Sequence, residues 1–498
     1  MTLRIYNTLS GRKECLVPVH PGEVRMYVCG VTVYDECHLG HARAYVSFDV
    51  IKRYLEFCGY RVHYVRNVTD VDDKIIEKAR REGRGVAEVS AQYYEEFSRQ
   101  MLLLGMSLPE REPRATEHIP EMVDLIGRLI AGGFAYAAGG DVFYEVAKFP
   151  AYGRLSKRTT DEMIAGARVE VNDKKKSPLD FVLWKAAKAG EPFWESPWGA
   201  GRPGWHIECS AMSMKYLGEH FDLHGGGQDL IFPHHENEIA QSSAATGRPL
   251  ANCWVHNGFV LSKSQKMSKS LGNVFSLTRL FELVSPSVVK FFLLTKHYRS
   301  PVDFDFAEMQ EYRKNLERID NTIALAHRRL EESGKECLGA AGRSLRRKDL
   351  EGDAAIAEFC QAMDDDFNTA RAVAVIHGIL GKMHANLAAK GSADELAAML
   401  EALLVILEVL GVVYQPLVME KVSVGASLPE GREQVLLAKE SLSEAEIVSL
   451  IEARNHARHE KNFARADRIR KALADKGIVL RDEKAEATTW ARISEKAH

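Results

Sequence analysis

The sequence predicts an α/β protein: a Rossmann-like parallel-sheet domain split by an insertion and followed by an α-helical bundle and a small C-terminal domain. Three observations carry this prediction. Strand and helix patterns alternate over the first hundred residues, the same rhythm returns from residue 204, and helix patterns dominate beyond residue 301. Alternating strands and helices give a parallel sheet covered by helices, whereas consecutive amphipathic helices form a bundle.

The first part of the chain contains the elements of such a sheet. Strand patterns cover residues 24–29 and 61–67, and helix patterns cover residues 42–58 and 72–81. Ligands of parallel sheets bind at the carboxyl ends of the strands. We therefore expect the functional residues to follow the strands directly.

The turn between the first strand and the first helix carries His38, Gly40 and His41. Gly40 lets the backbone approach a ligand closely, and the N-terminus of the following helix attracts anions. Two imidazoles there are suited to donating hydrogen bonds to phosphate oxygens. A short histidine pair before a helix is also compatible with ordinary capping, so this turn alone does not decide between the two readings.

The strand–helix rhythm breaks after residue 108. A helix pattern at 119–131 is followed by strand-like residues 141–146, a charged loop at 173–176 and several prolines. We interpret this region as an insertion into the parallel sheet, with its charge run as a solvent-exposed loop.

A stretch rich in metal-ligating side chains opens the second half of the sheet. Cys209, His234 and Glu238 are ligand types that zinc takes, and His234 and Glu238 are four residues apart on one expected helix face. Cys29, at the end of the first predicted strand, is the best candidate for a fourth ligand. A core thiol among unrelated polar residues has the same spacing, so spacing alone leaves zinc open.

Two further segments of this half suit phosphate or nucleotide binding. A predicted strand at 221–224 ends in three glycines, which allow a ligand to lie against the backbone or simply form a turn. A strand-like run at 254–261 leads into a loop rich in Lys and Ser that contains Lys266 and Lys269. A mobile cationic loop suits a transient phosphate species, but this composition is also common in solvent-exposed loops.

Helices are expected over most of the rest of the chain. The last unit has seven Lys or Arg between residues 454 and 471, against Glu460 and Asp467. This is either a solvated helix face or a contact to a nucleic-acid backbone. We place the domains at 1–112 (catalytic domain, first half), 113–200 (inserted connective domain), 201–300 (catalytic domain, second half), 301–417 (helical bundle), 418–440 (linker) and 441–498 (small basic C-terminal domain).

Composition limits the class of protein. A net charge of −3 excludes a general polycation, and eight irregularly spaced Cys favour reduced thiols over a secreted disulfide framework. The N-terminus has no apolar signal-peptide core, and the longest apolar stretch, 396–414, contains two glutamates. We expect a cytoplasmic protein with no membrane partner.

The order of these motifs resembles one family closely. Residues 266–270 read KMSKS, the complete second signature of class I aminoacyl-tRNA synthetases, and residues 38–41 read HLGH, the HIGH signature with Leu39 for Ile. Within that class, CGVTVYDECHLGHAR, NVTDVDDKII, HGGGQDLIFPHHENEIAQS and the C-terminal FARADRIR are similar to the cysteinyl-tRNA synthetase family over nearly the whole chain. Glu36, where an aromatic residue is usual, and two long linkers depart from the family pattern.

The resemblance implies a function and a set of site residues. It implies an ATP-dependent ligase that forms cysteinyl-adenylate and transfers cysteine to the terminal adenosine of cysteine tRNA, acting as a monomer on L-cysteine, ATP and tRNA. It also implies one Zn²⁺ per chain, and Mg²⁺ accompanying ATP. The implied residues are Cys29, Cys209, His234 and Glu238 for zinc, His38, Gly40, His41, Lys266 and Lys269 for ATP and catalysis, and Trp205, Asp229 and Thr69 for the substrate.

Three alternative functions account for less of the sequence. A related ligase that joins cysteine to an amino-sugar conjugate, in thiol-cofactor biosynthesis, would share the catalytic half but would not need the helical bundle or the basic tail. A non-catalytic zinc-containing RNA-binding protein would not need the histidine and lysine signatures. A plain nucleotidyltransferase would have no reason for Cys29 and Cys209.

Overall fold

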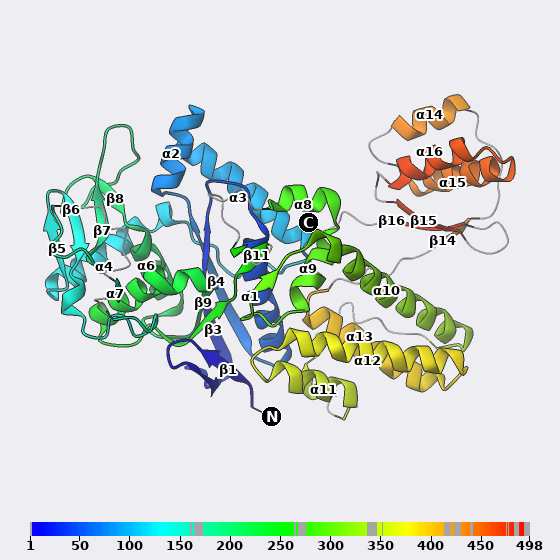
Figure 1. Cartoon of the computed structure of the whole chain (residues 1–498), viewed down its shortest axis with the longest axis horizontal. Helices are drawn as coiled ribbons and strands as arrows, with labels where there is room; N and C mark the ends of the chain where they lie inside the picture. Colours follow the sequence, from blue (N-terminus) through cyan, green and yellow to red (C-terminus); the bar gives the residue numbers. More distant parts are fainter. Residues whose placement is uncertain are drawn as a thin grey trace. The chain divides into compact units, whose positions relative to one another are not determined.

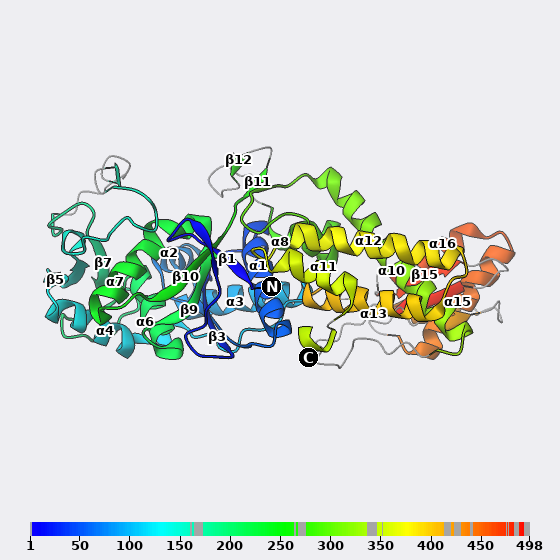
Figure 2. The ribbon, with the colours of Figure 1, turned by 90° about the horizontal axis from the view of Figure 1, so that it is seen from below.

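The computed structural model describes residues 2–159, 162–163, 173–262, 265–266, 275–335, 346–350, 352–412, 420–422, 430–438, 442–474, 476, 478–482 and 488–492. The chain divides into two compact units, Met1–Val413 and Tyr414–His498. The first unit contains the parallel sheet, the insertion and the helical bundle, and the sheet lies between the other two (Figures 1 and 2).

A four-stranded parallel sheet forms the centre of the first unit, with strand order β10-β9-β3-β4. Its strands are β3 (Glu23–Thr32), β4 (Arg61–Thr69), β9 (Phe221–Gly227) and β10 (Ala251–Asn257). Helix α1 (Leu39–Phe57) connects β3 to β4, and α7 (Glu236–Thr246) lies between β9 and β10. The predicted Rossmann-like sheet is therefore confirmed. Its topology reverses direction between β3 and β9, the place where such sheets bind ligands.

Side chains from the two faces of the sheet explain two of the three glycines that end β9. Consecutive strand residues face opposite sides. A Cβ added to Gly225 would lie 2.3 Å from Phe48 of α1, and one added to Gly226 would lie 2.9 Å from His235. These glycines thus admit the protein's own side chains, which the sequence reading of a ligand-contacting turn did not anticipate.

The insertion folds as an antiparallel sheet packed beside helices. Its strand order is β5-β6-β7-β8, and the elements are α4 (Ile119–Ala131), β5 (Ala135–Ala138), β6 (Asp141–Tyr144), β7 (Phe181–Ala186) and β8 (Gly201–Pro203). Its apolar residues join those of the parallel sheet in one core that includes Trp184 and Trp254. Helix α6 (Trp205–Leu217) follows directly and returns the chain to the parallel sheet.

Four helices, a hairpin and a small sheet accompany the parallel sheet. The helices are α2 (Asp73–Glu82), α3 (Val86–Leu103), α8 (Leu277–Leu283) and α9 (Pro286–Leu294). An N-terminal hairpin consists of β1 (Arg4–Asn7) and β2 (Arg12–Cys15). A three-stranded sheet of order β12-β11-β13 consists of β11 (Val260–Ser262), β12 (Gln265–Lys266) and β13 (Val302–Asp303).

The predicted helical bundle is also present. It consists of α10 (Met309–Glu332), α11 (Ala354–Met363), α12 (Thr369–Ala388) and α13 (Ala393–Val409). The apolar stripe of α10 is buried at Ile319, Ile323 and Leu330. The hydroxyl of Ser392 accepts from the Glu395 amide and so caps the start of α13.

The second unit combines three helices with a small sheet. The helices are α14 (Glu430–Ala438), α15 (Glu444–His459) and α16 (Phe463–Ala474), and the sheet has order β14-β16-β15 with β14 (Glu420–Val422), β15 (Ile478–Asp482) and β16 (Thr488–Arg492). The stretch 418–440 was expected to be a linker, but it contributes β14 and α14. Strand β14 has only three residues and depends on pairing with distant β16, so it carries no periodic pattern of its own.

The described residues contain no helix that is long and apolar enough to cross a membrane. Leu403 and Ile406 of α13, which contains most of the longest apolar stretch, are instead buried in the bundle.

A buried cluster of charges joins α1, α9 and the end of α13. Asp49 accepts from Lys290 at 3.3 Å and from Arg53 at 2.9 Å, and Lys290 also donates to the Gly105 carbonyl at 3.1 Å. Burial lowers the pKa of Lys290 to about 8. A Cβ added to Gly411, which follows α13, would lie 2.5 Å from Nζ of Lys290. Glycine at this position lets α13 dock on the cluster.

We expect Gly411→Ala to lower stability more than Gly83→Ala. Both glycines end helices in the left-handed region, with φ of +64° and +66°, but nothing lies within 4 Å of a Cβ at Gly83. Left-handed strain costs each variant about 1–2 kcal/mol, and crowding at Gly411 adds roughly 1–3 kcal/mol. Scanning calorimetry of both variants measures the difference, and equal losses would show that the cluster does not confine Gly411.

Candidate metal centre and nucleotide site

The four predicted metal ligands come together at the carboxyl end of the parallel sheet. Cys29 lies in β3, Cys209 in α6, His234 in η4 (Ile231–His235) and Glu238 in the first turn of α7. All four are buried, and their ligand atoms lie within 4.8 Å of one another. The structure thus gathers residues up to 209 positions apart in the sequence into one potential ion site.

The distances within this cluster are short. Sγ of Cys29 lies 3.6 Å from Sγ of Cys209 and 3.4 Å from Oε1 of Glu238, and Nε2 of His234 lies 3.1 Å from the same oxygen. The helical spacing of His234 and Glu238 turns both side chains toward the two thiols, as the sequence predicted.

A second set of residues overlaps with the first. His224 of β9 and His235 share Cys29 and Glu238 with it and also lie within ligand distance. Nε2 of His224 lies 2.8 Å from Oε2 of Glu238, and Nε2 of His235 lies 3.2 Å from Sγ of Cys29. No role was predicted for His224 or His235. Their spacing in the sequence does not show that β9 and η4 bring them to the same point.

Further side chains fix the orientation of the cluster. Nδ1 of His206 lies 2.9 Å from Nδ1 of His234, so one of these rings donates to the other. Trp205 stacks on His234 with ring centroids 4.2 Å apart. The amide oxygen of Asn67 accepts from the Gly30 backbone at 2.7 Å and lies 3.6 Å from Sγ of Cys209. Such outer contacts hold metal ligands in one orientation.

The electrostatics of the cluster fit a divalent cation. Burial raises the pKa of the Cys29 and Cys209 thiols and lowers the pKa of His234. Without a cation the thiols are therefore protonated and the imidazole is neutral. A divalent ion replaces the thiol protons and offsets the cost of burying thiolates beside a carboxylate. Two sulfurs, one imidazole nitrogen and one carboxylate oxygen are a donor set that zinc accepts.

The histidine turn lies at the N-terminus of α1. Nδ1 of His38 accepts from the Gly40 amide at 3.1 Å, and Nδ1 of His41 accepts from the His38 amide at 3.1 Å. The two rings stack with centroids 3.9 Å apart. Because Nδ1 accepts in both rings, the proton of each neutral imidazole resides on Nε2. Each histidine can therefore cap the helix through Nδ1 and still donate a hydrogen bond to a ligand from Nε2.

The lysine loop is anchored beside this turn. Residues 267–274 lie outside the described part of the chain, and with them Lys269; Lys266 is placed only through its backbone in β12. After the loop, the Leu277 amide donates to the Cys37 carbonyl at 2.7 Å and the Leu39 amide donates to the Phe275 carbonyl at 3.3 Å. Before the loop, Lys266 pairs with Leu261 of β11. Both ends of the loop are therefore fixed, and one of them is fixed to the histidine turn itself.

The three predicted substrate residues have different environments. Trp205 is 36% exposed beside His234, and Asp229 lies in η3 (Gln228–Leu230) just after β9. Thr69 is buried, and its hydroxyl donates to Glu208 at 2.8 Å and accepts from Asn67 at 3.2 Å. Trp205 therefore lies against a candidate metal ligand, whereas the hydroxyl of Thr69 is used in contacts with Glu208 and Asn67.

Comparison with solved structures identifies the fold. The methionyl-tRNA synthetase of Mycobacterium tuberculosis bound by methionyl-adenylate matches with a TM-score of 0.56 at 16% identity, over 78% of this chain and 90% of that chain. A leucyl-tRNA synthetase of Agrobacterium radiobacter, in a complex with tRNA, matches with a TM-score of 0.56 at 12% identity, over 80% of this chain and 84% of that chain. The fold is that of the class I aminoacyl-tRNA synthetases.

Family comparisons are more specific. Residues 15–314 match the class I (C) tRNA synthetase catalytic domain, residues 358–415 a DALR domain and residues 443–490 the cysteinyl-tRNA ligase anticodon binding domain. Cysteine–tRNA ligases of Geobacter sulfurreducens and Geobacter metallireducens are 51% and 52% identical, each over 98% of this chain and 99% of the relative. The chain belongs to the cysteine–tRNA ligase family.

Proposed function

We propose that this enzyme activates L-cysteine with ATP and transfers it to the 3′ terminal adenosine of cysteine tRNA, and that a Zn²⁺ bound by Cys29, Cys209, His234 and Glu238 selects the substrate thiol. The observation that carries the metal part of this proposal is the buried four-residue cluster at the carboxyl end of the parallel sheet. Membership of the cysteine–tRNA ligase family supports the reaction.

Selecting cysteine requires a feature that distinguishes sulfur from oxygen. Serine differs from cysteine by this one atom, and a pocket that relies on shape rejects a near-isostere by only about 10²-fold. We take a discrimination of about 10⁴, or roughly 5.5 kcal/mol, as the target for faithful protein synthesis. When bound, Zn²⁺ supplies a direct bond to a thiolate that a serine hydroxyl matches poorly.

Glu238 is the ligand best placed to make room for the substrate sulfur. Its Oε1 faces Cys29 and His234, whereas its Oε2 lies 2.8 Å from Nε2 of His224. The carboxylate therefore keeps a partner in the protein if Oε1 moves aside. Cys29, Cys209 and His234 would continue to hold the ion.

The residues of the two signatures would act on ATP. In the proposed reaction the cysteine carboxylate attacks the α-phosphate, and pyrophosphate leaves. Such reactions depend on positioning and on stabilisation of phosphate charge. His38 and His41 would donate from Nε2, Gly40 would allow close approach of the phosphates, and Lys266 and Lys269 would stabilise the developing charge. Mg²⁺ would accompany ATP.

The amino acid would lie between these two groups of residues. Trp205 would form the wall beside the metal ligand, and Asp229 would bind the α-ammonium group or the ribose. Thr69 would act through Glu208 and Asn67, because its hydroxyl contacts both of them.

Two assays in sequence test the function. Cysteine-dependent exchange of pyrophosphate into ATP measures adenylate formation and would be absent from a non-catalytic RNA-binding protein. Charging of a cysteine tRNA transcript then separates a tRNA ligase from an enzyme that joins cysteine to an amino-sugar conjugate. Exchange without tRNA charging would contradict the proposal, and a transcript that lacks its anticodon loop tests the contribution of the C-terminal unit.

A further inference from the structure

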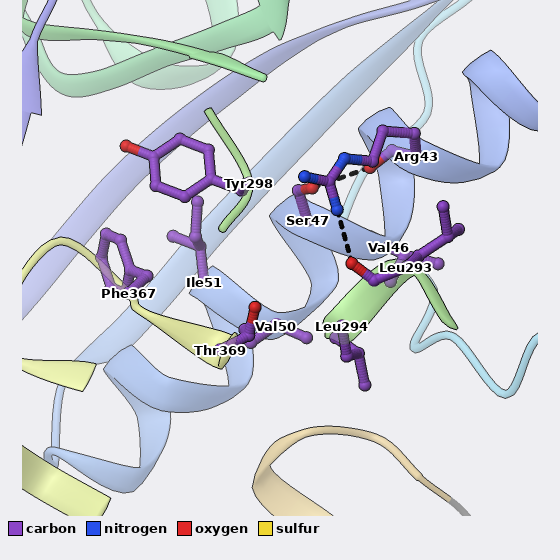
Figure 3. A pocket seen from close by; sticks show the side chains of 10 residues that line it. All are labelled: Arg43, Val46, Ser47, Val50, Ile51, Leu293, Leu294, Tyr298, Phe367 and Thr369. Atoms are coloured by element: carbon purple, nitrogen blue, oxygen red, sulfur yellow. Dashed lines mark hydrogen bonds between the residues drawn. The ribbon is translucent and has the colours of Figure 1, made fainter. Parts of the chain in front are cut away.

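Arg43 lies in α1, two residues after His41, and its side chain is almost completely buried. Its guanidinium donates to the carbonyl of Leu293 at 2.5 Å (Figure 3). It also donates to the carbonyl of His297 at 2.6 Å. Longer contacts reach the carbonyls of Lys296 at 3.5 Å and Ser300 at 3.4 Å. These groups belong to the end of α9 and the turn after it, where helix carbonyls lack intrahelical partners and carry partial negative charge.

The positive charge of Arg43 is buried and is stabilised by backbone carbonyls instead of a carboxylate. Burial lowers its pKa to about 10, so it remains a cation near neutral pH. Within the described part of the chain, no carboxylate lies at ion-pair distance from it. The adjoining cavity has a volume of about 10 Å³, which is room for no more than a single water. A buried cation is costly unless its donors are satisfied, and the planar guanidinium reaches several carbonyls at once, which a lysine cannot do.

Asp366 holds the same turn from the other side. It accepts from the Tyr298 hydroxyl at 2.8 Å, from Nε of Arg299 at 2.6 Å and from the Tyr6 amide at 2.8 Å. Asp366 and the following Phe367 both have positive φ, at 68° and 50°. Non-glycine residues adopt this conformation at a cost and keep it only where their surroundings impose it. The turn after α11 is thus built to present this carboxylate.

The segment held between Arg43 and Asp366, residues 293–300, supports the strands that lead into the lysine loop. The Gly258 amide donates to the Tyr298 carbonyl at 2.9 Å, and a Cβ added to Gly258 would lie 2.5 Å from the Arg299 carbonyl oxygen. Strand β13 then pairs with β11, and β11 pairs with β12, which carries Lys266. A shift of the 293–300 segment would therefore move the base of the lysine loop.

We propose that Arg43 and Asp366 are positioning residues that clamp the 293–300 segment from two sides and so set the distance between the histidine turn and the lysine loop. Arg43 ties the segment to the helix that begins at the histidine turn, and Asp366 ties it to the helical bundle. This inference rests on the proposed action of both signatures on ATP. Neither residue contacts the substrate in this role.

The test uses conservative variants of both residues in the full-length enzyme. Asp366→Asn keeps the shape of the side chain and tolerates positive φ. Arg43→Lys keeps the positive charge but loses the planar guanidinium that reaches several carbonyls at once. A misplacement of about 1 Å costs up to roughly 10²-fold in rate, so we expect kcat of cysteine-dependent pyrophosphate exchange to fall about 10- to 100-fold. The KM for cysteine and the bound zinc are expected to stay unchanged, since the metal cluster lies outside the clamp.

Two neighbouring substitutions serve as matched controls. Asp365→Asn removes the adjacent carboxylate, which is 44% exposed and pairs with Lys13, and Ser47→Ala removes a hydroxyl that lines the same cavity as Arg43 (Figure 3). Both are expected to keep the exchange rate of the unaltered enzyme. Arg43→Ala should in addition recover exchange activity when millimolar guanidinium is added, a response that a general loss of folding would not give.

Two results would refute the positioning role of Arg43 and Asp366 and leave the proposed function unaffected. Unchanged kcat in Asp366→Asn and Arg43→Lys, together with impaired exchange in Lys269→Ala, would refute the clamp while the signature assignment stands. Loss of zinc and of cysteine affinity in parallel with kcat would also refute it, because the defect would then be one of folding. If the Arg43 variants do not fold, Asp366→Asn decides the matter alone.

Discussion

Cys209→Ala is expected to remove most of the preference for cysteine over serine. The proposed metal loses one of two sulfur ligands, and the remaining pocket distinguishes the two amino acids by shape alone. The ratio of kcat/KM for cysteine to that for serine should fall from about 10⁴ or better to about 10², a loss of roughly 2.7 kcal/mol of discrimination. Pyrophosphate exchange with each amino acid, together with metal analysis of the purified protein, measures both effects.

Cys253→Ala provides the matched control. Cys253 is a buried thiol of β10 and belongs to neither set of clustered ligands. Its replacement likewise removes one buried sulfur atom, from strand β10 instead of helix α6, and we expect zinc content and selectivity to be retained. If Cys209→Ala still prefers cysteine by about 10⁴-fold, the thiol is selected by other means.

The second large effect is expected for Lys269→Ala. The lysine loop is proposed to stabilise the charge that develops on the α-phosphate, and removal of one such group typically costs about 10²–10³-fold in rate. Rapid-quench measurement of adenylate formation should show this loss. The affinity for free cysteine, measured by equilibrium dialysis, should remain nearly unchanged, because the metal cluster is intact.

Lys263→Ala is the control for loop charge in general. Lys263 lies in the same cationic segment, three residues before the signature. A similar loss in this variant would mean that net charge, not Lys269, accounts for the effect. A large loss of cysteine affinity in Lys269→Ala would contradict the proposed role in a different way, since it would place this lysine with the amino acid.

Local patterns explain why much of the fold was predictable. The strands expected at 24–29 and 61–67 are the cores of β3 and β4, and the helix expected at 119–131 matches α4. In these elements the spacing of the apolar residues and the residues at the two ends indicate the same bounds. The metal cluster was predictable through Cys209, His234 and Glu238 because helix periodicity and ligand chemistry point to the same residues.

The remaining features depend on contacts between distant segments. Strand β14 exists only through its pairing with β16, and His235 reaches Cys29 across 206 positions. Arg43 bonds to backbone carbonyls about 250 residues away, and carbonyl partners leave no mark in the side-chain pattern. For Gly225 and Gly226 the sequence left a ligand contact and a simple turn open, and the structure shows instead that Phe48 and His235 take the space.

The central claim is that a metal ion held by Cys29, Cys209, His234 and Glu238 bonds directly to the substrate sulfur. The most direct test replaces the ion with Co²⁺ and records the absorption spectrum as amino acid is added. Cysteine should strengthen the thiolate-to-cobalt charge-transfer band, because a third sulfur joins the ion, and serine should leave that band unchanged. A spectrum that does not respond to saturating cysteine would contradict the account.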